Sequence, residues 1–122
     1  MNLFQGKPKK HPDFEVTWDE EADDILRKSG NYTLEQIHND FELDPLNRAV
    51  KVDPDLPYFV TPVLDRRYSV IWQLSEGAEK KIAKVSAVVP LRFAGVAEGL
   101  TLKQRVKTAV QRASNGRVAL DF

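Results

Sequence analysis

The chain has 122 residues, a common size for one folded domain and enough to bury a hydrophobic core. It contains no cysteine, so disulfide bonds and thiolate metal sites are excluded. Its apolar runs are far shorter than the roughly 20 residues that a membrane-spanning helix requires, and its N-terminus lacks a signal-peptide pattern. We therefore expect a single cytoplasmic domain that does not enter a membrane.

The formal net charge is zero, but acidic and basic residues are unevenly distributed. Residues 13–65 hold 14 acids and 4 bases, whereas residues 66–122 hold 11 bases and 4 acids; residues 1–12 add three lysines. Two oppositely charged halves attract each other when they pack together, but a basic half is also suited to bind nucleic acid or an acidic protein. The sequence leaves both interpretations open.

The N-terminal part of the chain predicts a tail, a strand and two helices. Residues 1–12 are expected to form a flexible basic tail, because lysine, glycine and proline there leave little apolar surface to bury. Alternating polarity over Phe14–Trp18 predicts a short strand with one buried face. A helix is favoured over about residues 19–29, because acids lie at the start of this segment and bases lie at its end. A second helix is predicted to begin at the possible cap Thr33 and to end before Pro45.

The segment from Tyr58 to Phe93 is predicted to form an antiparallel β-meander. Its three expected strands are Tyr58–Leu64, Tyr68–Leu74 and Lys80–Val89. The links between them are short enough that only hairpins fit. Pro62 marks the first strand as an edge or bulged strand. Alternation predicts one common face for Tyr68, Val70, Trp72 and Leu74 in the middle strand, and one for Ala83, Val85, Ala87 and Val89 in the last strand.

A connector precedes the meander and a helix follows it. Residues 43–57 contain three prolines and predict an irregular connector with a short extended piece at residues 49–52. The pattern from Thr101 to Gln104 predicts a capping box that begins a C-terminal helix with one apolar stripe. The other face of this helix is expected to carry Lys103, Arg105, Lys107 and Arg112.

This order of elements resembles the RelE/ParE-like toxin superfamily of bacterial type II toxin–antitoxin systems. The residues that carry the resemblance are Tyr68–Leu74 (YSVIWQL), a charged turn, and then Lys81–Val88 (KIAKVSAV). Residues 14–22 also look like the first strand of that family entering its helix. The resemblance covers residues 13–93 and implies a RelE/ParE-like α+β domain over residues 13–122, with a C-terminal helical extension from about residue 101.

The resemblance implies either a ribosome-dependent ribonuclease or a gyrase inhibitor, in both cases neutralised by a partner antitoxin. The catalytic pattern matches only in part. Ser69 stands where the family has an arginine, whereas Arg66 and Arg67 lie just before that strand. The lysines expected on the preceding strand are absent, and Phe93 stands where a catalytic tyrosine would be needed. The expected activity is therefore RNA cleavage, or inhibition of translation or gyrase by a degenerate site.

Candidate site residues follow from this comparison. The candidate catalytic residues are Arg66, Arg67 and Arg92. The candidate RNA-binding or partner-binding residues are Tyr58, Tyr68, Lys84, Lys103, Arg105 and Lys107. Arginine side chains grip phosphate oxygens and aromatic rings stack on bases, so these residue types suit an RNA surface. The alternative interpretation is that Tyr68 and Trp72 belong to the core and that the arginines solubilise a hairpin tip.

Other chemistries are not indicated by the sequence. The two histidines, His11 and His38, lie in separate predicted segments, so we expect no metal site and no cofactor. Neither a glycine-rich phosphate loop nor a nucleophile elbow is present. A second hypothesis is a non-enzymatic adaptor that holds a protein partner at the meander edge near Pro62 or at the C-terminal helix.

Overall fold

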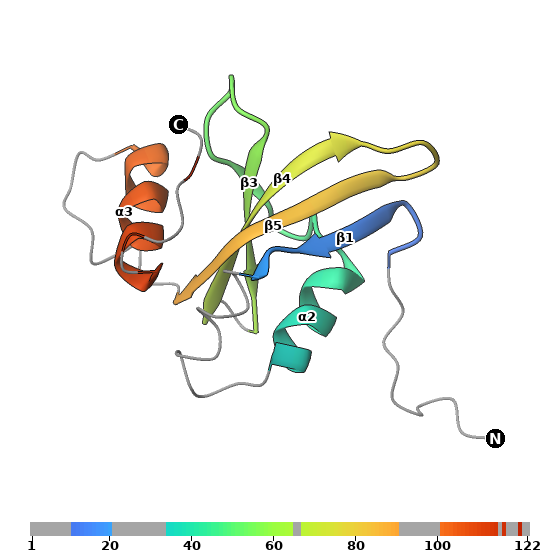
Figure 1. The fold of residues 1–122 in the computed structure, drawn as a ribbon, viewed down its shortest axis with the longest axis horizontal. Coiled ribbons are helices and arrows are strands. Elements are labelled where there is room, and N and C mark those ends of the chain that lie inside the picture. Colours follow the sequence, from blue (N-terminus) through green and yellow to red (C-terminus); the bar gives the residue numbers. More distant parts are fainter. Residues whose placement is uncertain are drawn as a thin grey trace.

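The computed structural model describes residues 11–20, 34–64, 67–90, 101–114, 116 and 120, and these contain a five-stranded sheet and two helices (Figure 1). The elements are β1 (Phe14–Trp18), α2 (Leu34–Leu43), β2 (Val50–Lys51), β3 (Tyr58–Val63), β4 (Tyr68–Glu76), β5 (Lys81–Pro90) and α3 (Leu102–Ser114). The predicted α+β class is confirmed. The helix predicted over residues 19–29 falls largely outside the described residues. Neither described helix is long and apolar enough to cross a membrane.

The sheet has the strand order β1-β5-β4-β3-β2 and is mixed. Strands β3, β4 and β5 form the predicted antiparallel meander, in which Tyr68 lies opposite Pro90. The short strand β2 adds to β3 at one edge. At the other edge β1 runs parallel to β5, with Phe14 opposite Lys81. A parallel partner requires a long connection, which the chain between β1 and β5 supplies.

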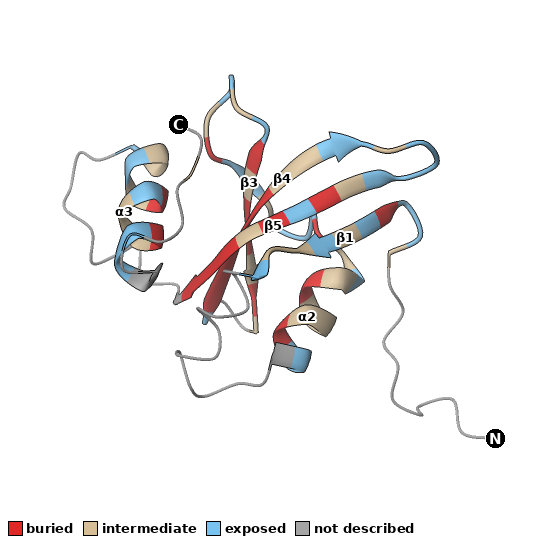
Figure 2. Cartoon of the chain, viewed as in Figure 1, coloured by how far each residue is buried: buried red, intermediate tan, exposed pale blue. Residues whose placement is uncertain are grey.

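The two helices pack on opposite faces of the sheet, giving three layers. On one face the buried residues around α2 are Phe14, Ile37, Phe41, Val63, Tyr68, Val70, Trp72, Ala83, Val85 and Val88. On the other face the buried residues around α3 are Val52, Tyr58, Val60, Ile71, Ala87, Val89, Val106 and Val110. Figure 2 shows buried residues along the centre of the sheet and on both helices. Because it supplies core residues, α3 is an integral layer of the fold.

A β-bulge in β5 changes the face that its side chains reach. Ile71 of β4 pairs with Ala87 of β5. The next residue of β4, Trp72, pairs with Val85, so Ser86 is the extra residue of the bulge. Val85 therefore faces α2, whereas Ala87 faces α3. The prediction of one common face along this strand is wrong, because the extra residue shifts the alternation by one.

The interior contains a hydrogen-bonded polar group beside its largest side chain. The fully buried Trp72 donates its indole N–H to the Thr61 hydroxyl at 2.8 Å. Thr61 in turn donates to the backbone carbonyl of Pro45. Phe59 stacks on Trp72, with ring centroids 4.9 Å apart. These contacts join β3 and β4 to the loop that follows α2.

The predicted capping box at the start of α3 is confirmed. The backbone N–H of Thr101 donates to Gln104 Oε1 at 3.0 Å, and the N–H of Gln104 donates to Thr101 Oγ1 at 3.2 Å. Each side chain thereby satisfies a donor that the first helical turn leaves unpaired. Beyond the helix, Gly116 has a φ of +79° and donates its N–H to the Gln111 carbonyl at 2.9 Å. A glycine adopts this left-handed conformation without the usual steric cost.

Candidate functional site

The turn between β3 and β4, residues 64–67, is called the arginine turn below, and the structure describes its first and last residues, Leu64 and Arg67. The N–H of Arg67 donates to the Leu64 carbonyl at 3.1 Å and closes the turn. Leu64 has a φ of +50°, which is uncommon for a residue with a branched side chain. Its N–H donates to the Asp40 carboxylate of α2 at 2.6 Å. The carboxylate therefore helps to stabilise an unfavourable backbone conformation next to the exposed Arg67.

The strand register brings two of the predicted arginine segments to one end of the sheet. Tyr68 begins β4 directly after the arginine turn, and it pairs with Pro90, the last residue of β5. The described residues nearest to Arg66 and Arg92 in the sequence, Arg67 and Pro90, therefore lie at the same end of the sheet. Both residues lie outside the described part of the chain, so their side chains are not placed.

Tyr58 and Tyr68 do not lie together on the surface. Both are buried, Tyr58 on the α3 side of the sheet and Tyr68 on the α2 side. Tyr58 pairs with Gln73, five positions along β4 from Tyr68, which corresponds to about 17 Å of strand. The two rings therefore cannot form one stacking platform for RNA bases. For Tyr68 and Trp72 the structure supports the alternative interpretation, in which both belong to the core.

The basic residues of α3 are divided between two flanks of the helix. Successive helical residues are about 100° apart, so Lys103 and Lys107 lie on one side of the buried stripe. Arg105 and Arg112 lie on the other side. Lys107 and Arg112 are exposed, whereas Lys103 and Arg105 are half-buried. The Arg105 Nε atom is buried without a hydrogen-bond partner among the described atoms. The single basic face expected from the sequence is therefore two narrower basic strips.

Lys84 lies in a different region from the arginine turn. It is exposed in β5, between Thr17 of β1 and Gln73 of β4. Its neighbours in the strand, Ala83 and Val85, face α2, so Lys84 points to the other side of the sheet. The predicted site residues that the structure describes thus fall into separate areas rather than one cluster.

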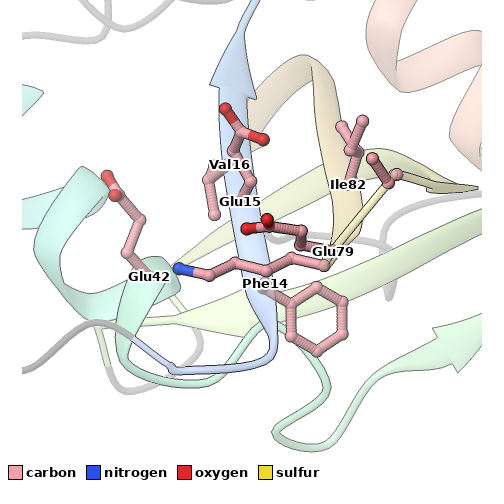
Figure 3. Close-up of a pocket in the computed structure, with 9 residues that line it drawn as sticks. Phe14, Glu15, Val16, Glu42, Glu79 and Ile82 are labelled. Carbon is pink, nitrogen blue, oxygen red and sulfur yellow. The ribbon is translucent and has the colours of Figure 1, made fainter.

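A hollow that the sequence did not reveal lies beside β1 (Figure 3). It has a volume of about 660 Å³ and is called the β1 hollow. Its lining includes Phe14, Glu15, Val16, Glu42, Glu79 and Lys80. The turn between β4 and β5, residues 77–80, also lines the β1 hollow, and a second hollow of about 570 Å³ lies against it. The β1 hollow is lined by β1, by α2 and by the segment from this turn into β5, which are distant in the sequence. Only the clustering of acids near the predicted first strand could therefore have indicated it.

Trp18 fastens β1 to α2 next to the β1 hollow. Its ring stacks on His38, with centroids 3.7 Å apart and an interplanar angle of 10°. Its indole N–H donates to the Glu42 carboxylate at 3.3 Å, and its ring meets Phe41 edge to face. His38, Phe41 and Glu42 are spaced by three and four residues and so share one face of α2.

The described residues contain no group of three or more histidine, cysteine, aspartate or glutamate side chains that could hold a metal ion.

Comparison with known proteins found no matching family model, no similar curated protein and no similar solved structure. From the contacts given above, two surfaces stand out in the described part of the chain, the arginine turn and the β1 hollow.

Proposed function

We propose that this protein is a RelE/ParE-like, toxin-related protein that inhibits its target by binding RNA phosphates through the arginine turn and Arg92. The observation that carries the proposal is the strand register, which pairs Tyr68 with Pro90. Arg67 lies at this end of the sheet. In the sequence Arg66 directly precedes it and Arg92 follows Pro90 by two residues, so we expect the three arginines to meet there. Guanidinium groups bind phosphate oxygens through two parallel hydrogen bonds, so a cluster of arginines suits this ligand.

The order of the described elements supports the family assignment within this proposal. Of the order that the resemblance implies, the described residues contain the first strand, one of the two helices before the meander, the meander itself and the helix after it. The hydrogen bond between Asp40 and Leu64 is a second support. Because Asp40 restrains Leu64 at the start of the turn, this residue loses less conformational freedom when a ligand binds than an unrestrained residue would.

Binding is favoured over RNA cleavage by the residues near the arginine turn. Cleavage requires a base to activate the 2′-hydroxyl and an acid to protonate the leaving oxygen. Tyr58 and Tyr68 are buried, and His38 stacks on Trp18 at the β1 side of α2. The Asp40 carboxylate already accepts the Leu64 N–H. In this proposal the protein therefore blocks an RNA-containing target without cutting the RNA.

The test is the triple substitution Arg66→Ala, Arg67→Ala and Arg92→Ala. We expect inducible expression of the unaltered protein to arrest bacterial growth and the triple variant to permit growth. Fluorescence anisotropy with labelled RNA should show roughly 10- to 100-fold weaker binding. The slope of log affinity against log salt should fall by about 2 to 3, because each lost phosphate contact lowers it by about 1.

The matched control is Lys51→Ala, Lys81→Ala and Arg112→Ala, which removes the same formal charge from exposed positions elsewhere. This control should bind RNA as the unaltered protein does. Equal losses in both variants would show an unspecific charge effect and contradict the proposed surface. Inhibition of gyrase supercoiling without RNA binding, or cleavage of ribosome-bound RNA, would also contradict the proposal.

A further inference from the structure

Strand β1 is an edge of the sheet with hydrogen-bonding groups directed outward. Among the described residues, β1 pairs only with β5. The N–H of Asp19 donates to the Val85 carbonyl of β5, so the odd-numbered residues here bond toward β5. Successive backbone groups alternate, and the N–H and C=O groups of Val16 and Trp18 therefore point away from the sheet. These groups can form a ladder with an added strand.

The opposite edge of the sheet is less suited to such an addition. Strand β2 has two residues, Val50 and Lys51, and prolines 54 and 57 follow closely. Short length, lysine and proline are the features by which edge strands avoid pairing with other chains. Strand β1 has five residues and neither a proline nor a lysine. Of the two edge strands, β1 therefore offers the longer edge for pairing with an added extended segment.

The charge around β1 selects the kind of segment that fits. Residues 11–20 and 34–43, which include β1 and α2, contain seven acids and no lysine or arginine. The adjoining turn and β5 add Glu79 and the three lysines 80, 81 and 84, so acids remain in excess around β1. Glu15 is exposed in the middle of β1. Antiparallel pairing of two copies of β1 would bring acidic strands together, and like charges on paired strands are destabilising. A basic segment is therefore favoured over a second copy of this chain.

The β1 hollow provides a place for one side chain of the added strand. Its acidic lining residues come from three elements, with Glu15 on β1, Glu42 on α2 and Glu79 in the β4–β5 turn (Figure 3). Lys80 is the basic residue of this lining. Phe14 contributes apolar surface, against which the methylene groups of a lysine or arginine can pack. A cavity of about 660 Å³ has room for such a side chain.

We propose that β1 binds an extended, basic segment of a partner protein by strand addition, with a lysine or arginine of that segment in the β1 hollow. Main-chain hydrogen bonds to Val16 and Trp18 supply affinity in this mode, and the hollow supplies specificity. This surface is separate from the arginine turn. The arginine turn precedes β4, whereas the β1 hollow adjoins the β4–β5 turn at the other end of that strand. The nine residues of β4 span about 30 Å.

The experiment is a titration of the full-length, ¹⁵N-labelled protein with a seven-residue peptide of alternating lysine and valine. We expect shifts and slowed hydrogen exchange at the amides of Val16 and Trp18, and no change at Val50 of the other edge. A peptide with glutamate in place of lysine should bind at least tenfold more weakly. So should a lysine peptide with a central proline, which retains the charge but cannot complete a ladder.

Two substitutions test the same surface from the protein side. Glu15→Lys should weaken binding at least tenfold. Its matched control is Asp55→Lys, an equal change of charge at an exposed position between β2 and β3, which should leave binding unchanged. Val16→Pro removes an outward N–H and preserves the bonds to β5. If that variant fails to fold, the Glu15 and Asp55 pair still decides the question.

Several results would overturn the proposal. Equal binding of the proline peptide would show that charge alone, without strand addition, accounts for the interaction. Equal binding of the acidic peptide would exclude the proposed charge selection. Peptide binding only after deletion of residues 1–10 would show that this chain's own basic segment occupies β1. Concentration-dependent dimerisation that protects the Val16 and Trp18 amides without peptide would identify a second copy as the occupant.

Discussion

At the residue scale, Thr61 is the polar group on which the packing of Trp72 depends. Its hydroxyl accepts the buried indole N–H and donates to the Pro45 carbonyl, so it satisfies two groups that water does not reach. An isolated buried donor costs the full desolvation free energy of that group. The hydrogen bonding of the buried Trp72 indole therefore depends on the side-chain oxygen of Thr61.

Replacing Thr61 with valine keeps the size of the side chain but removes this oxygen. We expect Thr61→Val to lower the free energy of unfolding by about 1 to 3 kcal/mol, because the Trp72 indole N–H is left without an acceptor. Urea denaturation followed by tryptophan fluorescence measures the change. Thr61→Ser retains the hydroxyl and should cost less. Thr17→Val, at an exposed position of β1, should change stability by less than about 0.5 kcal/mol.

The sequence predicted the core residues better than it predicted this contact. Alternation within one strand indicated a shared buried face for Val70 and Trp72, and both are fully buried. The role of Thr61 could not be predicted, since its acceptor, Pro45, lies 16 residues earlier in a loop. Hydrogen bonds between segments distant in sequence have no local pattern.

At the element scale, local signals predicted where elements begin, and contacts between elements decided the rest. The bounds of β1 and the capping box of α3 were predicted correctly because both depend on neighbouring residues. The bulge at Ser86 and the parallel pairing of β1 with β5 were not predicted. Register is a property of two strands, so one strand's alternation cannot reveal an extra residue.

The β4–β5 turn gives a test at this scale, because Gly77 has no room for a side chain. A methyl group there would collide with the backbone carbonyl oxygen of Lys80, to which Gly77 donates its N–H. We expect Gly77→Ala to lower the free energy of unfolding by about 1 to 3 kcal/mol, since backbone must shift. Thermal unfolding measures this. Ala78→Gly, at an exposed position in the same turn, should cost less than about 1 kcal/mol; an equal or larger loss would contradict the steric explanation.

At the scale of the whole molecule, α3 closes one face of the sheet. The sequence predicted a helical extension, yet Val106 and Val110 are fully buried against Ile71, Ala87 and Val89. Amphipathic periodicity predicted the helix but not its role, because one apolar stripe can face its own domain or a partner. Without α3 the buried residues of β3, β4 and β5 on this side would be exposed to water.

The double substitution Val106→Ala and Val110→Ala tests this role. It should lower the free energy of unfolding by roughly 3 to 5 kcal/mol, from lost burial and the cavities left behind. Denaturant unfolding measures the loss, and binding of a hydrophobic dye would report exposure of the sheet. The control Lys107→Ala and Gln111→Ala alters exposed positions of the same helix and should be nearly neutral. Equal stability of both variants would show that α3 is dispensable.

The candidate site was predictable only where it followed from strand order. Pairing β4 with β5 was expected from the meander, and it places the arginine turn beside the end of β5. The separation of Tyr58 from Tyr68 follows from register and face. The β1 hollow could not be predicted, since it needs β1, α2 and the β4–β5 turn to meet.

The hydrogen bond between Asp40 and Leu64 has a consequence for communication within the molecule. Helix α2 touches the arginine turn through Asp40 and borders the β1 hollow through Glu42, two residues later. These side chains lie on nearly opposite sides of a ten-residue helix. A displacement of this helix by a ligand at one surface would also disturb the other. Thermodynamic reciprocity then requires that RNA and a bound strand alter each other's affinity by the same factor.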